Sequence, residues 1–207
     1  EKHLNIEKTW LDEIHIKVDN YNKRYFLTSF YYKERRGNID GYYFYVWDKI
    51  NGQPLVETIH IFSDELRSEA RGDASARTAF NDYFIRQIIT RRDGGFLIGS
   101  EAYYTTSRFN NWNRWDNLYG GSPYYYPGAS NYYYSPFYDR FRWGRGGNSN
   151  QAVRHHADNI TVMSFNNQGQ LEWNTVLGKT QFDDENGEMI SYQLMNTGDQ
   201  IHFLFNQ

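Results

Sequence analysis

The residues best suited to molecular recognition are aromatic, and they crowd into one segment, residues 105–157. Tryptophan and tyrosine supply stiff, amphipathic contact area and dominate the energetics of protein interfaces. Gly, Asn, Ser and Arg separate them, a composition typical of neither a core strand nor an ordinary linker. The candidate binding residues are Trp112, Trp115, Tyr119, Tyr124, Tyr125, Tyr126, Tyr132, Tyr133, Tyr134, Tyr138 and Trp143.

Three interpretations of this aromatic insertion stay open. It could fold back and cap a sheet, it could bind a partner protein with help from its arginines, or its rings could stack on sugars. The insertion is far longer than the usual connection of about two to six residues. We therefore expect it to interrupt a regular fold rather than to form part of one.

Other candidate groups carry weaker signals. His155 and His156 are neighbours, and neighbouring side chains on a strand point to opposite faces, so we do not expect them to share a metal ion. The acidic segment 183–188 lacks the spacing of a calcium loop and is interpreted as a solvated turn. The sequence contains no nucleophile-elbow, phosphate-loop, zincin or dinucleotide motif. We therefore predict no catalytic residues, no cofactor and no metal.

Composition narrows the class of protein. The net charge is −3, so there is no basic footprint and we expect no nucleic-acid partner. No run approaches the ~20 apolar residues that a membrane-spanning helix needs. The chain has no cysteine, which excludes disulfides and thiolate metal sites. It does not begin with Met and shows no signal peptide at Glu1, so we expect a processed or truncated product.

Alternating apolar and polar residues predict the strands that must position the insertion. Turn signals rich in Gly and Asn separate the strands. Residues 63–77 could hold a helical turn but are interpreted as a polar connection. The expected strands are 14–18, 25–32, 41–48, 55–62, 83–90, 96–104, 160–165, 171–176, 189–195 and 201–205.

The order of these strands repeats along the chain. Phe26-Leu27 and Tyr31-Tyr32 in the first round correspond to Phe96-Leu97 and Tyr103-Tyr104 in the second. Four antiparallel strands followed by a polar link are typical of a propeller blade. We therefore predict an all-β chain of antiparallel four-stranded blade repeats, β-propeller-like but partial, with about two and a half blades.

A closed propeller needs about four or more blades. Either the chain is a fragment, or another copy or chain supplies the rest, or the sheets pack as an open sandwich. The predicted divisions are an extension at 1–13, a first blade-like unit at 14–80, a second at 81–180 with insertion 105–157, and the start of a third at 181–207.

Three stretches carry a resemblance to a known group: GGFLIGSEAYY from Gly94, DNITVMSFNNQGQLEWNTVLGKTQ from Asp158, and SYQLMNTGDQIHFLFNQ from Ser191. Residues 84–206 resemble propeller-like exported proteins of Gram-negative bacteria, whereas Tyr42–Trp47 departs from their pattern. The resemblance implies an exported protein that is periplasmic, associated with the outer membrane or at the cell surface. It implies no reaction.

Together these observations predict a non-enzymatic envelope protein that holds another protein through its aromatic insertion, as an accessory subunit of a larger complex. The alternative is a carbohydrate-binding or glycoside-hydrolase-type module, with a glycan as ligand. Hydrolysis would require two carboxylates placed across one site. A third reading is a structural blade set whose insertion only shields a sheet face.

Overall fold

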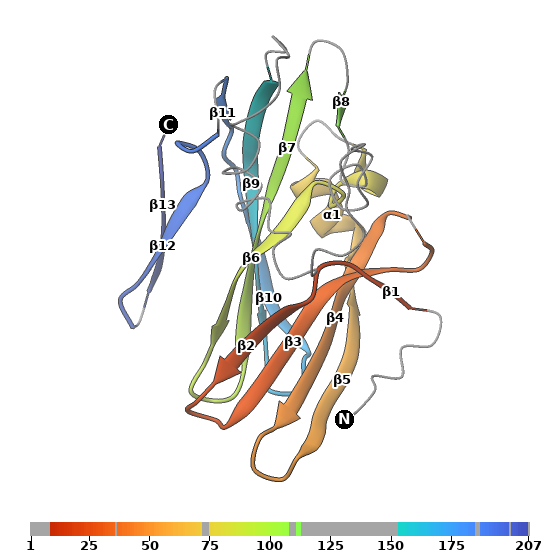
Figure 1. Cartoon of the computed structure of the whole chain (residues 1–207), viewed down its shortest axis with the longest axis vertical. Coiled ribbons are helices and arrows are strands. Elements are labelled where there is room, and N and C mark those ends of the chain that lie inside the picture. Colours follow the sequence, from red (N-terminus) through yellow and green to blue (C-terminus); the bar gives the residue numbers. More distant parts are fainter. Residues whose placement is uncertain are drawn as a thin grey trace, which may run out of the picture. The chain divides into compact units, whose positions relative to one another are not determined.

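The computed structural model describes residues 9–35, 37–71, 75–107, 111–112, 153–184, 187–198 and 200–206. Strands dominate, and Figure 1 traces them from red to blue along the chain. The elements are β1 (Trp10–Leu11), β2 (His15–Asp19), β3 (Arg24–Tyr32), β4 (Ile39–Asp48), β5 (Gln53–Ile61), α1 (Asp64–Ala70), the 3₁₀ helix η1 (Ala76–Thr78), β6 (Tyr83–Thr90), β7 (Phe96–Ser107), β8 (Asn111–Trp112), β9 (Val153–Phe165), β10 (Leu171–Leu177), β11 (Gln181–Asp183), β12 (Tyr192–Asn196) and β13 (Ile201–Phe205).

The chain divides into two compact units, and β7 and β9 contribute residues to both. Unit 1 comprises Glu1–Glu101 and Asn159–Leu177, and unit 2 comprises Ala102–Asp158 and Gly178–Gln207. Among the described residues every sheet is antiparallel and none closes on itself. The all-β prediction is therefore confirmed. No helix in this part of the chain is both long and apolar enough to cross a membrane.

Unit 1 contains two antiparallel sheets whose strands follow one another in sequence order. In sheet A, β3 lies between β2 and β4, and β5 follows β4, with the short β1 also paired to β3. In sheet B the order is β10-β9-β7-β6. Each predicted strand of these two rounds is present, and the ends lie close to those expected from the apolar alternation except where β7 and β9 meet the insertion.

Aromatic side chains fill the space between the two sheets. Phe165 of β9 lies 4.6 Å from the ring centroid of Phe44 in β4 and 5.2 Å from that of Phe96 in β7. The hydroxyls of Tyr42 and Ser100 are 2.5 Å apart and join the sheets through a buried hydrogen bond. Since buried aromatics contribute large apolar areas, this layer is the main source of unit 1's stability.

The β6–β7 turn explains one sequence motif. Gly94 has φ +84°, and a Cβ on Gly95 would lie 2.7 Å from the carbonyl oxygen of Phe165. The Arg91 guanidinium of the same turn bonds to Ser164 at 2.8 Å and pairs with Glu172. Gly94-Gly95 and Glu172 belong to the stretches that carry the resemblance. They thus hold the β6–β7 turn against the β9–β10 hairpin.

The polar connection predicted at 63–77 is wrong over its first half, where helix α1 forms. Ser63 caps the helix by accepting a hydrogen bond from the backbone N–H of Leu66 at 3.2 Å. Leu66 is buried, and Arg67 donates to the carbonyls of Ile39 and Asp40 at 3.1 Å each. Buried apolar contact and these two bonds outweigh the charged composition of the segment.

Two boundaries in unit 2 also differ from expectation. Residues 177–188, which contain none of the predicted strands, include β11, which pairs with β9. The strand predicted from residue 189 begins at Tyr192 as β12, because Met189 is largely exposed and does not join the ladder with β13. Strands β7 and β9 run further than predicted, so the connection between them begins after Ser107 and ends before Val153.

Candidate functional site

The predicted aromatic site lies almost wholly outside the described residues. Trp112 is the exception in that its backbone belongs to β8 and pairs with Thr105 of β7. The other ten candidates, from Trp115 to Trp143, lie in the part of the chain that is not described. What the structure does describe is the pair of strand ends that carry the insertion, residues 102–107 and 153–158, which we call the stalk.

Hydrogen bonds between side chains join the two strands of the stalk. The Tyr103 hydroxyl lies 2.8 Å from Nδ1 of His155. The Tyr104 hydroxyl donates to the Asp158 carboxylate at 2.9 Å. Two residues beyond Tyr104, the Thr106 hydroxyl lies 3.1 Å from Nε2 of His156. Three cross-strand contacts therefore brace the segment at which the insertion leaves the sheet.

The Tyr104 ring also stacks on the His156 ring, with centroids 4.5 Å apart and planes 5° from parallel. Because residue pairs 103/155 and 104/156 alternate along their strands, the stalk is braced on both faces. His155 and His156 accordingly have different partners. Within the described ranges, no three His, Asp or Glu side chains come together in a way that could hold a metal ion.

Charged groups extend the stalk toward β11. Arg154 donates to both carboxylate oxygens of Asp184, at 2.5 and 2.9 Å, and its guanidinium lies 4.5 Å from the centroid of the Phe182 ring. This partner lowers the pKa of Asp184 and raises that of Arg154. Burial lowers the pKa of His156, so the imidazole that contacts Thr106 is neutral at pH 7.

Two polar side chains missed by sequence reasoning anchor the segment that follows. Lys179 is buried, and its ammonium donates to the carbonyl of Ala157 and to the side chain of Gln181, both at 2.6 Å. Gln181 in turn accepts the backbone N–H of Ser191 at 2.9 Å. A lysine in a charged stretch gives no sequence signal of burial, since the bonds that stabilise it come from distant residues.

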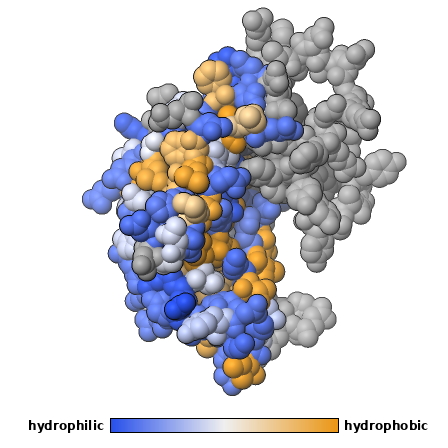
Figure 2. Space-filling view, turned by 90° about the vertical axis from the view of Figure 1, so that its left-hand side faces the viewer, coloured by the Kyte–Doolittle hydropathy of each residue, from blue (hydrophilic) through white to orange (hydrophobic). Residues whose placement is uncertain are grey.

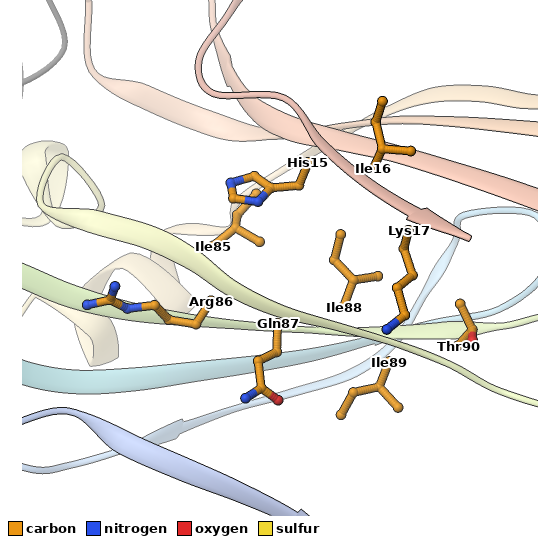
Figure 3. Close-up of a pocket in the computed structure, with 9 residues that line it drawn as sticks. All are labelled: His15, Ile16, Lys17, Ile85, Arg86, Gln87, Ile88, Ile89 and Thr90. Atoms are coloured by element: carbon orange, nitrogen blue, oxygen red, sulfur yellow. The ribbon is translucent and has the colours of Figure 1, made fainter. Parts of the chain in front are cut away.

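A groove of about 440 Å³ opens in unit 1 between the edge strands of the two sheets. Its walls come from β2 and β6, the first strand of each round. His15, Lys17 and Ile88 lie between the two strands, whereas Ile16 points away from the groove (Figure 3). Figure 2 shows the face of the molecule that lies on the left in Figure 1, and hydrophilic and hydrophobic patches alternate on it.

His15, which lines this groove, and the neighbouring Glu13 have strongly shifted pKa values. Burial raises the pKa of Glu13 from 4.5 to about 7, partly opposed by Arg86. Burial lowers the pKa of His15 from 6.5 to about 4. The two side chains lie 3.7 Å apart, and both neutral forms coexist over a wide pH range.

Near this pair, Arg86 forms a buried ion pair with Glu101 of β7, and its Nε lies 3.0 Å from Oε2 of Glu101. Glu101 is completely buried. The strands that carry these residues were predicted, but the approach of β2 to β6 was not. Arg86, which with Gln87 interrupts the apolar stretch 83–89, was the available signal, because a buried cation requires a buried partner.

Comparisons with known proteins add no relative: no family model, no curated protein and no solved structure matches this chain.

Proposed function

We propose that this chain is a non-enzymatic, propeller-like protein of the bacterial envelope that binds a partner protein through its aromatic insertion. The observation that carries the proposal is the stalk. A loop that binds a partner needs a rigid base, because ordering a flexible loop on binding costs free energy. The cross-strand contacts of Tyr103, Tyr104 and Thr106 supply such a base at the point where the insertion begins and ends.

The composition of the insertion supports recognition of a protein. Its tyrosines and tryptophans are the residue types that concentrate binding energy at interfaces, and its arginines join them in that role. No cluster of described residues resembles a hydrolytic centre. The resemblance over residues 84–206 implies only the envelope location, and the accessory role in a larger complex is part of the proposal.

The propeller-like arrangement is supported by the strand order in unit 1. Sheets A and B are both built as meanders, they pack face to face, and their first strands β2 and β6 approach each other. Consecutive blades of a propeller share these properties. The β12–β13 hairpin would then begin a third blade, and further blades would come from another copy or chain.

The test is recovery of bound proteins from cells that naturally make this protein, after cross-linking in place. Replacing Tyr124–Tyr126 and Tyr132–Tyr134 with Ser should lower recovery of the partner at least tenfold, as expected when hot-spot aromatics are lost. The control is the double variant Tyr21→Ser and Tyr25→Ser, which changes exposed tyrosines of unit 1. Unchanged recovery with the six replacements would refute the proposal.

The same two variants separate a glycan ligand from a protein partner. On a glycan array, the proposal predicts no binding that depends on the six tyrosines. Specific glycan binding that the six replacements abolish would favour the carbohydrate-binding alternative.

A further inference from the structure

A second recognition site can be argued at the groove in unit 1, away from the insertion. Within the described residues β2 pairs with β3 alone, and β6 pairs with β7 alone. Each strand is thus the edge of its sheet. Edge strands carry backbone N–H and C=O groups with which an incoming strand can pair. Two such edges border one groove here, so the backbone of both sheets is accessible from a single opening.

The side chains of β2 divide between the two faces that an added strand would cover. His15 and Lys17 point into the groove together with Ile88 of β6 (Figure 3). Ile14, Ile16 and Val18 lie on the opposite face, where they are 47%, 67% and 45% exposed. A strand added to β2 would place alternate side chains in the groove and the others beside these exposed apolar residues.

The charged side chains at the groove indicate what kind of segment would bind there. Arg86 is held by Glu101, whereas Lys17 makes no ion pair with any described residue. A cross-strand neighbour of opposite charge stabilises a sheet, and a like charge destabilises it. A carboxylate is therefore the favoured partner of Lys17 within the groove. A second copy of β2 would bring one Lys17 close to the other, which disfavours self-pairing.

We propose that the β2–β6 groove binds an extended segment of a partner protein by strand addition to β2, with an acidic side chain opposite Lys17 and β-branched apolar residues on either side of it. The length of β2, five residues, sets the length of the recognised core. This site is independent of the aromatic insertion.

A phage-displayed library of random nine-residue peptides tests the proposal on the intact chain. Selection should enrich an acidic residue flanked by valine, isoleucine or threonine. A peptide from that selection should perturb the amide resonances of β2 and β6 in ¹⁵N-labelled protein. Methylating the backbone nitrogens on its strand-pairing side should abolish binding, because those nitrogens donate the ladder hydrogen bonds.

A charge reversal provides the decisive comparison. Lys17→Glu should weaken binding of the selected peptide about three- to tenfold and should favour the same peptide with lysine in place of its acid. Lys49→Glu, in the turn after β4, is the matched control and should change neither affinity. Lys17 is exposed, so its replacement should not disturb folding, and the amide spectrum of the variant checks this.

Three results would overturn the proposal. One is a selection whose peptides show no acidic residue flanked by valine, isoleucine or threonine. Another is a peptide preference that Lys17→Glu leaves unchanged. The third is perturbation confined to residues outside β2 and β6.

Discussion

The β3–β4 hairpin of sheet A and the β7–β9 hairpin of sheet B occupy the same place in their sheets but end differently. β3 and β4 have 9 and 10 residues, whereas β7 and β9 have 12 and 13. A short loop joins the first pair, and residues 108–152 lie between the second. The comparison shows that the sheet plan accommodates the insertion by lengthening the two strands next to it.

The two hairpins also differ in what holds them. Phe30, Tyr42 and Phe44 of the β3–β4 hairpin are buried in the aromatic layer. The added length of β7 and β9 is held mainly by polar bonds, such as that of Tyr104 to Asp158. We infer that the paired sheets determine stability, while the stalk determines how the insertion is presented.

The largest expected effect lies in the aromatic layer. Phe165→Ala should lower the free energy of unfolding by about 3–5 kcal/mol, because it leaves a cavity among Phe44, Phe96 and Tyr42. Urea denaturation measures the change. Phe182→Ala is the matched control, since Phe182 is exposed, and it should cost less than about 1 kcal/mol. Equal costs at the two sites would show that the aromatic layer between the sheets is not the main source of stability.

A smaller effect should appear in the pH dependence of the paired sheets. The raised pKa of Glu13 gives stability that is complete below pH 4.5 and is lost as the pH rises to about 7. The lowered pKa of His15 gives stability that is complete above pH 6.5 and is lost as the pH falls to about 4. These opposite slopes offset each other between pH 4.5 and 6.5.

Replacing one of the two groups at a time should reveal how the other makes the free energy of unfolding depend on pH. Glu13→Gln should lose roughly 2–3 kcal/mol between pH 6.5 and 4 relative to wild type. His15→Gln should instead gain a similar amount, relative to wild type, over the same fall in pH. Urea titrations at each pH measure both. Parallel curves for the two variants and wild type would show that neither group is desolvated at the edge of the sheets.

The stalk should respond more weakly and locally. Tyr104→Phe keeps the ring stacked on His156 but removes the hydrogen bond to Asp158. The cost should be about 1 kcal/mol, which corresponds to roughly fivefold faster hydrogen exchange at amides of residues 154–158. Tyr21→Phe, at an exposed turn position, is the control. Exchange that stays at the wild-type rate would mean that the polar bonds do not brace the stalk.

Much of the strand layout could be predicted from the sequence, because local patterns encode it. Period-2 alternation located both rounds of strands, and the positive φ of Gly52 and Gly169 confirms two predicted turns. Helix α1 was ranked below a polar connection because its apolar face consists of little more than Leu66 and Ala70. So short a face gives no helical periodicity to detect.

The sites were harder to predict, since they depend on contacts between residues far apart in the chain. The bond between Tyr103 and His155 depends on the register of β7 and β9 across the whole insertion. The groove depends on how sheet A faces sheet B, which no local pattern specifies. Sequence reasoning could name the aromatic candidates but not the strand ends that carry them.

Removing the insertion should have the smallest effect on stability and the largest on binding. Joining Ser107 to Val153 through an Asn-Gly turn shortens a loop, and loop length contributes little to the free energy of folding. The thermal midpoint should therefore move by less than about 4 °C.

The most direct test of the account is the amount of partner protein recovered with this shortened chain. The account predicts a loss of at least tenfold from a protein that unfolds at nearly the wild-type temperature. Full recovery would contradict it, and so would a fall of more than roughly 10 °C in the midpoint, because the insertion would then be a cover for the sheets rather than a binding surface.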